Sequence, residues 1–203
     1  MSVRRNVQSD KLEFDPKKHE YKINGIVVPS VTQILKETGF YSYGHVNQEV
    51  LQRAANFGSA VHYAAKLDDE DNLGVCQDAI IPYLEGWRKF KKDFGAQFSI
   101  IEEHLYSKKR MFAGTPDRLL ALNGALIDIK TGQKEGWHSV QLAGYEVLIK
   151  EINPEFKIKK RWTVYLKPDE YKIIAYSGWE ESIFLSALAI VHWKRNKNIK
   201  GEE

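Results

Sequence analysis

The sequence predicts an α/β fold, with a central mixed β-sheet and helices on both of its faces. Two observations lead to this class. Short apolar runs bounded by turn residues alternate with longer segments whose apolar residues recur at helical spacing. Strands and helices are also interleaved along the chain, which is typical of a sheet covered by helices. The 203 residues predict a single domain over 1–203, with an N-terminal hairpin and a helical elaboration at about 12–95.

The first part of the chain is predicted to form a hairpin and three helices. Residues 12–28 alternate in polarity and turn at Asn24-Gly25, a pair typical of tight hairpin turns. Ser30 is a good N-cap, so a short helix is expected from there to about Lys36. Two longer helices are predicted at about 46–66 and 76–94.

The rest of the chain is predicted to supply the sheet and two more helices. Strands are expected at about 97–106, 112–121, 125–130, 159–166 and 171–176. Helices are expected at about 138–151 and 179–195. The first of these should end before Asn153-Pro154, because a residue that precedes proline disfavours helical backbone.

Residues 114–130 contain the pattern with the clearest chemical meaning. Two apolar runs flank a turn at residues 123–124, so the segment is predicted to be a β-hairpin. Asp128 and Lys130 are two residues apart on one strand, and their side chains therefore leave the same face. Asp117, near the start of the partner strand, can point to that face too. Two carboxylates and an ammonium suit metal-assisted attack on a phosphodiester, since carboxylates hold a hard cation and the lysine offsets developing negative charge.

Together with other motifs, this hairpin resembles the PD-(D/E)xK nuclease superfamily. The resemblance is to its RecB-like branch, which includes phage-type and mitochondrial genome maintenance exonucleases, and it covers about residues 20–180. The segments that carry it are Gly58-Ser-Ala-Val-His62, Glu102, Gly114-Thr-Pro-Asp117, Asp128-Ile-Lys130 and Gln141-Leu-Ala-Gly-Tyr145. The resemblance implies a restriction-endonuclease-like nuclease core and a metal-dependent deoxyribonuclease. It favours an exonuclease of the phage or bacterial recombination or repair type.

The resemblance also implies a set of metal ligands. Asp117 and Asp128 would bind Mg²⁺ or Mn²⁺, together with the backbone carbonyl of Ile129 and the imidazole of His62. Oxygen ligands suit both cations, and an imidazole suits Mn²⁺ better than Mg²⁺. Gly58, four residues before His62 on the same predicted helix, would leave room for a close neighbour. Taken alone, such a histidine is more often a core or surface residue.

The expected catalytic residues are Lys130, Asp117, Asp128 and Glu102. Lys130 resembles the catalytic lysine of the superfamily, which would stand beside the attacking water and the scissile phosphate. The spacing favours Glu102 as an additional carboxylate, with Glu103 as the alternative, because neighbouring strand residues face opposite ways. Gln141 and Tyr145, at i and i+4 of a predicted helix, resemble a motif that orients the lysine and contacts substrate backbone.

Composition excludes several classes of protein. The single cysteine, Cys76, allows no disulfide within the chain and no four-cysteine iron–sulfur cluster, and here the sequence departs from several RecB-like relatives. No apolar run approaches the roughly 18 residues of a membrane span. The N-terminus has no apolar block typical of a secretory signal. We therefore expect no membrane partner and a cytoplasmic location, in a bacterial or phage-infected host cell.

DNA is the expected partner. A net charge of +3 is only mildly basic, but local basic clusters would suit phosphate contacts around an acidic metal site. Each cluster alone is more often a solvated face. The clusters are Arg88-Lys89 with Lys91-Lys92, Lys108-Lys-Arg110, Lys157 with Lys159-Lys-Arg161, and Lys194-Arg195 with Lys197. The sequence leaves open a homo-oligomer or a recombination or repair partner protein.

Two other functions stay open. A nucleic-acid-binding module that no longer cuts would be expected to lack at least one of Asp117, Asp128 and Lys130, and all three are present. A restriction-like or nicking endonuclease would often carry a separate target-recognition region, for which 203 residues leave little room.

Overall fold

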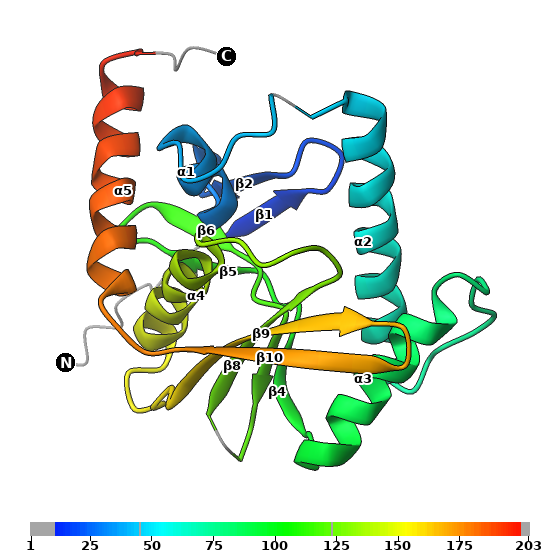
Figure 1. The fold of residues 1–203 in the computed structure, drawn as a ribbon. Helices are drawn as coiled ribbons and strands as arrows, with labels where there is room; N and C mark the ends of the chain where they lie inside the picture. The colour runs from blue at the N-terminus through cyan, green and yellow to red at the C-terminus, as the bar shows by residue number, and fades with distance from the viewer. Residues whose placement is uncertain (1–10, 45, 123, 200–203) are drawn as a thin grey trace.

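A five-stranded mixed β-sheet with helices on both faces forms the centre of the structure (Figure 1), as the sequence predicts. The computed structural model describes residues 11–44, 46–122 and 124–199. The strand order is β10-β9-β8-β7-β4. These strands are β4 (Phe98–Ile101), β7 (Arg118–Leu120), β8 (Ala125–Lys130), β9 (Lys160–Lys167) and β10 (Glu170–Tyr176).

The sheet is mixed because one connection in it crosses over. β8 pairs in parallel with β9, and helix α4 (His138–Ile152) connects them. The other neighbouring strands of this sheet pair antiparallel. A parallel pair needs a long crossover, and a helix is its usual form. A connection of seven residues, 131–137, leads from the carboxyl end of β8 to the N-terminal part of α4.

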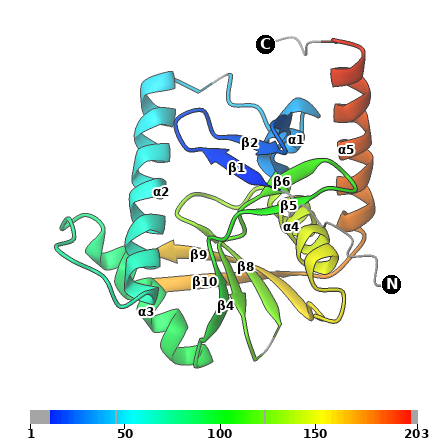
Figure 2. The same cartoon turned by 180° about the vertical axis from the view of Figure 1, so that it is seen from behind.

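The alternation of side chains along β8 separates two apolar layers. Ala125, Ile127 and Ile129 pack with α2 (Gln48–Asp69) and α3 (Ile81–Phe94), whereas Leu126 packs with α4 and α5 (Glu180–Asn196). Figures 1 and 2 show α2 and α3 on the opposite side of the sheet from α4 and α5. Asp128 and Lys130 share the face of Leu126, so they project toward α4. Among the described residues, no helix is long and apolar enough to cross a membrane.

Two smaller sheets and a short helix complete the described fold. One contains β1 (Leu12–Asp15), β2 (Glu20–Ile23) and β3 (Ile26–Val28), and the other contains β5 (Leu105–Ser107) and β6 (Phe112–Gly114). Helix α1 (Val31–Glu37) begins at Ser30 as predicted. The Ser30 hydroxyl accepts from the backbone N–H of Gln33 at 3.1 Å, and the Gln33 side chain accepts from the Ser30 N–H at 2.9 Å. These reciprocal bonds form a capping box.

The predicted N-terminal hairpin is in fact three strands. The turn at Asn24-Gly25 is present, with both residues at positive φ. An earlier turn was not predicted, and the Asp15 side chain stabilises it by accepting from the backbone N–H groups of Lys17 and Lys18 at 2.9 and 3.2 Å. Such side-chain bonds to the backbone two or three residues ahead mimic a turn.

Two predicted strands are each broken in the middle, and their halves join different sheets. The segment 97–106 divides into β4 and β5 at Glu102, whose φ of +48° is incompatible with a strand. The segment 112–121 divides into β6 and β7 around Pro116, which lacks a backbone donor. Both breaks fall at candidate site residues.

Other boundaries also differ from the sequence prediction. The helix predicted from residue 76 begins at Ile81, with proline in its first turn, the helical position that tolerates this residue best. The hairpin of β7 and β8 is antiparallel as predicted. In its expected turn, Gly124 has a φ of +56°, whereas Asn123 lies outside the described residues. Residues 1–10, on which the prediction about a secretory signal rests, also lie outside them.

Gly86 allows α3 to lie against the turn between β9 and β10. A Cβ at this position would overlap the carbonyl of Glu170 and stand 2.9 Å from the carbonyl oxygen of Lys167. Both neighbours are backbone atoms, so the helix or the turn would have to shift. We expect Gly86→Ala to lower the free energy of unfolding by about 1–3 kcal/mol, measured by urea denaturation. Gly74→Ala, whose added methyl meets open space, is the control. Equal midpoints for Gly86→Ala and the wild type would contradict this close approach.

Candidate functional site

A cavity of about 250 Å³ opens where the two broken strands meet α2 and α4. The residues that line it come from six separate parts of the chain. They are His19, Tyr21, Ser30, Val31, Thr32, His62, Glu102, Gly114, Thr115, Asp117 and Tyr145. Three of the predicted metal-binding or catalytic side chains, His62, Glu102 and Asp117, are therefore in the wall of one cavity.

Asp117 and His62 both contact the backbone of Ile129. The Asp117 carboxylate accepts from the Ile129 N–H at 2.6 Å, and His62 Nε2 lies 2.8 Å from the Ile129 carbonyl oxygen. His62 Nδ1 is 3.7 Å from the Asp117 carboxylate. The antiparallel register, continued by two residues, places Pro116 opposite Ile129, so the Asp117 side chain satisfies a donor at the end of the ladder.

Asp128 and Lys130 form an ion pair on the α4 side of the sheet, in which the lysine side chain is 22% exposed. Lys130 Nζ donates to Asp128 Oδ1 at 2.9 Å, and the Asp128 side chain is 1% exposed. The second oxygen, Oδ2, is buried without a hydrogen-bond partner, and so is the hydroxyl of Thr163, the residue paired with Asp128 on β9. Buried polar atoms normally have hydrogen-bond partners, so these two oxygens remain able to bond to a further group near the carboxyl end of β8.

The two aspartates repel one another in this arrangement. Burial raises the pKa of Asp128 from 3.8 to about 6; Lys130 opposes this rise, and Asp117 adds to it. Burial also works against the charged form of Lys130, but the carboxylates of Asp128 and Asp117 outweigh it and raise the pKa of the ammonium. A divalent cation would relieve the repulsion between the carboxylates.

The donor set fits a hard divalent cation. It offers carboxylate oxygens of Asp117 and Asp128, the carbonyl of Ile129 and the imidazole of His62, and the unpartnered Asp128 Oδ2 is the best-defined free ligand atom. In the part of the chain that the structure describes, no three His, Cys, Asp or Glu side chains are clustered as a metal-binding group. Instead, the Ile129 backbone is contacted directly by His62 and Asp117.

The additional carboxylate in the cavity wall is that of Glu102. Its side chain lies 3.2 Å from Arg118 Nη1 and 3.9 Å from Lys66 Nζ. Glu103 is exposed and does not line the cavity. The expectation that these glutamates lie on a strand was wrong, because both follow the end of β4. It is the strand break, rather than alternation within a strand, that turns Glu102 toward Asp117.

Gln141 and Tyr145 present together on α4, as their spacing predicts. The Gln141 amide donates to the Tyr145 hydroxyl at 3.1 Å, and both residues are buried. Tyr145 lines the cavity, and burial raises its pKa well above the ordinary value, so it stays a neutral hydrogen-bonding group. Gly114 allows the Tyr145 ring to lie close to the backbone of β6, since a Cβ at Gly114 would stand 2.9 Å from that ring.

Three further residues lie near the site. Gly58 faces Thr131, but a Cβ there would stand 3.5 Å from the Thr131 hydroxyl, an ordinary contact, so glycine is not required for space. His138 is buried and hydrogen-bonded to the Tyr165 hydroxyl at 2.7 Å, so it offers no exposed ring for a base. Trp137 packs on Tyr41 with ring centroids 4.5 Å apart and stands 5.7 Å from Lys130 Nζ.

The basic clusters are only partly available for phosphates. Arg161 is buried and paired with Glu180 and Glu146, so it belongs to the interior and not to a DNA-binding face. Arg88 and Lys91 pair with acidic residues at the end of α2. These arginine and lysine side chains were expected to contact solvent or phosphate.

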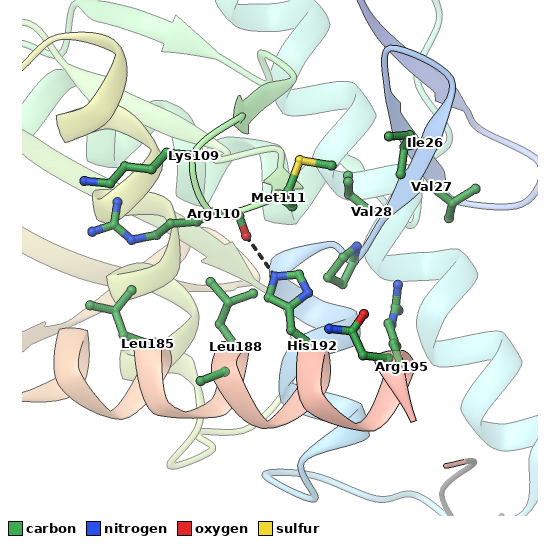
Figure 3. Close-up of a pocket in the computed structure, with 13 residues that line it drawn as sticks. Ile26, Val27, Val28, Lys109, Arg110, Met111, Leu185, Leu188, His192 and Arg195 are labelled. Carbon is green, nitrogen blue, oxygen red and sulfur yellow. Dashed lines mark hydrogen bonds between the residues drawn. The ribbon is translucent and has the colours of Figure 1, made fainter. Parts of the chain in front are cut away.

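A second and larger cavity of about 700 Å³ lies between α5, β3 and the turn after β5 (Figure 3). Its walls are mainly aliphatic, as Figure 3 shows for Val28, Met111 and Leu188, and His192 Nε2 contacts the Arg110 carbonyl there at 2.8 Å. No aspartate or glutamate lines it. Of these two cavities, the smaller one carries the acidic side chains, which are those of Glu102 and Asp117.

Comparisons with known proteins give no family for the chain. No protein-family model and no curated protein matches it. A solved structure described as "Crystal structure of SSO0001" covers 80% of this chain and 75% of its own, with 16% sequence identity and a TM-score of 0.41. A similarity of this strength carries no argument about fold or function.

Sequence reasoning missed several residues that the structure brings to the site. Lys66 and Asp69 follow His62 at i+4 and i+7, so helical spacing alone could have placed them on the same face of α2. His19, in the turn before β2, and Tyr21, in β2, line the cavity more than 90 residues from Asp117 in the chain and carried no local signal. Arg118 was not among the candidate residues, yet it is fully buried.

In the metal-free protein, Asp128 is expected to make stability decrease as the pH rises. Its pKa is about 6 in the folded protein, above the ordinary 3.8, so the folded state binds more protons between these values. The stabilising contribution is therefore complete below about pH 4 and is lost as the pH rises through about 6; it amounts to at most about 3 kcal/mol. Urea unfolding of Asp128→Asn should lack this part of the pH dependence, whereas Asp169→Asn, in an exposed turn, should retain it. An identical pH dependence in Asp128→Asn and wild type would rule out the account.

Proposed function

We propose that this protein is a divalent-metal-dependent deoxyribonuclease that hydrolyses DNA phosphodiester bonds, acting as an exonuclease. The observation that carries the proposal is the convergence of Asp117, His62 and the Asp128–Lys130 pair around the backbone of Ile129. Repelling carboxylates, an unpartnered oxygen and a buried ammonium in one place are costly for folding, and such groups cluster at functional sites. The sequence resemblance to RecB-like nucleases supports the same reading.

The cation would be Mg²⁺ or Mn²⁺, held by Asp117, Asp128, His62 and the Ile129 carbonyl. When bound, it would supply Lewis-acid stabilisation of charge that develops on the phosphate oxygens. The protein's own part is to fix the donors in advance. The Asp117 carboxylate is held by the Ile129 N–H, and Asp128 is held by Lys130 and by the rigid centre of the sheet.

Lys130 acts in the chemical step. A charged ammonium has no lone pair, so it does not bind the cation. The Asp128 carboxylate fixes its position at 2.9 Å, and its raised pKa keeps it protonated. From there it orients the attacking water and stabilises negative charge on the phosphoryl group in the transition state. Tyr145, neutral and exposed to the cavity, can donate a hydrogen bond to the substrate backbone.

The mode of cleavage is tested with two DNA substrates. Purified protein is incubated with end-labelled linear DNA and with closed circular DNA, in Mg²⁺ or Mn²⁺. We expect degradation of the linear DNA only, which requires a free end. Cutting of the circle would instead identify an endonuclease. Binding without cleavage of either substrate would favour a nucleic-acid-binding module.

Lys130→Ala is expected to reduce turnover by about 10²–10³-fold, as for the loss of one preorganised donor. Mn²⁺ affinity should persist or increase, because a positive charge near the cation is removed. Arginine should restore little activity, since its planar fork differs in shape from a compact ammonium. Lys172→Ala, an exposed lysine on β10, is the control. If Mn²⁺ binding is lost together with activity in Lys130→Ala, the lysine organises the site and its catalytic role is refuted.

A further inference from the structure

A buried ion network lies directly behind the cavity. Arg118, the first residue of β7, has a fully buried side chain, and its Nε donates to Asp69 at 2.7 Å. Its Nη1 donates to the carbonyl of Asp117 at 2.7 Å and lies 3.2 Å from the carboxylate of Glu102. One guanidinium therefore connects the end of α2, the break after β4 and the backbone of a candidate metal ligand.

Arg118 is fixed in place by its surroundings. Its guanidinium carbon lies 5.8 Å from the ring centroid of Trp87 and 6.0 Å from that of Phe98. Asp69, also fully buried, accepts from the Trp87 indole N–H at 2.9 Å and from Lys91 at 2.8 Å. Trp87 and Phe98 are stacked on each other with ring centroids 5.6 Å apart, so the guanidinium lies beside this stack, and the paired carboxylate of Asp69 fixes its position.

The network determines where Glu102 stands. This residue has a φ of +48°, and its N–H donates to the Asp117 carbonyl at 3.0 Å. Its carboxylate is held between Arg118 and Lys66 at the cavity wall. The left-handed backbone is unfavourable for glutamate, so the surrounding contacts must maintain it. Arg118 supplies two of these contacts, one to the Glu102 side chain and one to the Asp117 carbonyl.

Stability alone gives a weak reason for this network. Replacing a buried ion pair by neutral groups of similar volume is often neutral or stabilising. The guanidinium lies beside the Trp87–Phe98 stack, within the apolar layer of α2 and α3, where an aliphatic side chain would pack well. A charge placed there, with contacts to two cavity residues, suggests a role in the geometry of the site.

We propose that Asp69 and Arg118 are a positioning pair that sets the places of the Glu102 carboxylate and the Asp117 backbone, and thereby the affinity of the cavity for a divalent cation. The proposal rests on the proposed function, since it assumes that the cation binds at Asp117 and Asp128. It adds a third contact to one face of α2. On this face His62 contacts Ile129, and Lys66 lies near Glu102. One turn farther along, Asp69 accepts from Arg118. Neither Asp69 nor Arg118 touches the cation in this scheme.

The test is a double variant, Asp69→Asn with Arg118→Met, which leaves no buried charge unpaired. Asparagine keeps an acceptor for the Trp87 indole, and methionine fills the space of the arginine stem. A calorimetric titration with Mn²⁺, without DNA, measures the affinity, and thermal unfolding reports the fold. We expect about 10–100-fold weaker Mn²⁺ binding, the usual cost of losing a residue that orients a ligand, in a folded protein. Unchanged Mn²⁺ affinity in a folded double variant would overturn the proposal.

Two further variants make the outcome decisive. Asp68→Asn removes the neighbouring carboxylate, which pairs with Arg88 and Lys91 and not with Arg118, and it should bind Mn²⁺ like the wild type. If the double variant does not fold, the Mn²⁺ affinity of Asp69→Asn alone is measured. Weaker binding than in the wild type supports the proposal, and wild-type affinity overturns it. Loss of Mn²⁺ binding in Asp128→Ala, with wild-type affinity in the network variants, would refute the positioning role and leave the proposed function intact. A wild-type protein that binds no Mn²⁺ would refute both.

Discussion

The bond between the Asp117 carboxylate and the Ile129 N–H is the contact around which the candidate site is arranged. It lies at the end of the pairing of β7 with β8, where the Ile129 N–H is bonded by a side chain and not by the backbone of the neighbouring strand. Because the carboxylate is held by the backbone of the neighbouring strand, its position follows from the sheet and not from a mobile loop. His62 contacts the carbonyl of the same residue, so both backbone polar groups of Ile129 are bonded by candidate ligands.

The charged residues around this point form two sets, an inner set beside the cavity and an outer set behind it. Near the cavity, Asp128 is paired with Lys130, and its burial, with a smaller contribution from the charge of Asp117, raises its pKa. Farther back, Asp69 and Arg118 are fully buried among aromatic rings. The inner set carries electrostatic repulsion. In the outer set the Asp69 carboxylate accepts from Arg118 and Trp87, while Arg118 Nη2 is buried without a hydrogen-bond partner. A rigid outer layer helps an inner layer to remain unfavourable.

Local patterns were enough to predict much of this arrangement. The hairpin of Asp117 and Asp128, the shared face of Asp128 and Lys130, and the Gln141–Tyr145 pair all depend on strand or helix periodicity, which the sequence states directly. The broken strands were not predictable in the same way. Glu102 lies within a run that favours a strand, and only pairing with distant segments makes it a turn.

The long-range polar contacts escaped prediction for a related reason. Arg118 is the first residue of β7 and Arg161 the second residue of β9, and an arginine near a strand end is expected to reach solvent. Their partners, Asp69 and Glu180, are 49 and 19 residues away along the chain, so no local spacing announces the pairing. A buried charge can be recognised only from the folded structure, in which both partners and the apolar layer around them are known.

The breaks in the two strands have a consequence for the order of assembly. The cavity wall combines residues from His19 to Tyr145, and β9, which covers one side of Asp128, follows only at residue 160. Contacts between such distant segments form late, because each requires closing a long loop of chain. During synthesis, a ribosome would have to release most of the polypeptide before these groups could meet. The cavity wall can therefore form only after Tyr145 has been synthesised, and the strand that covers Asp128 follows later still.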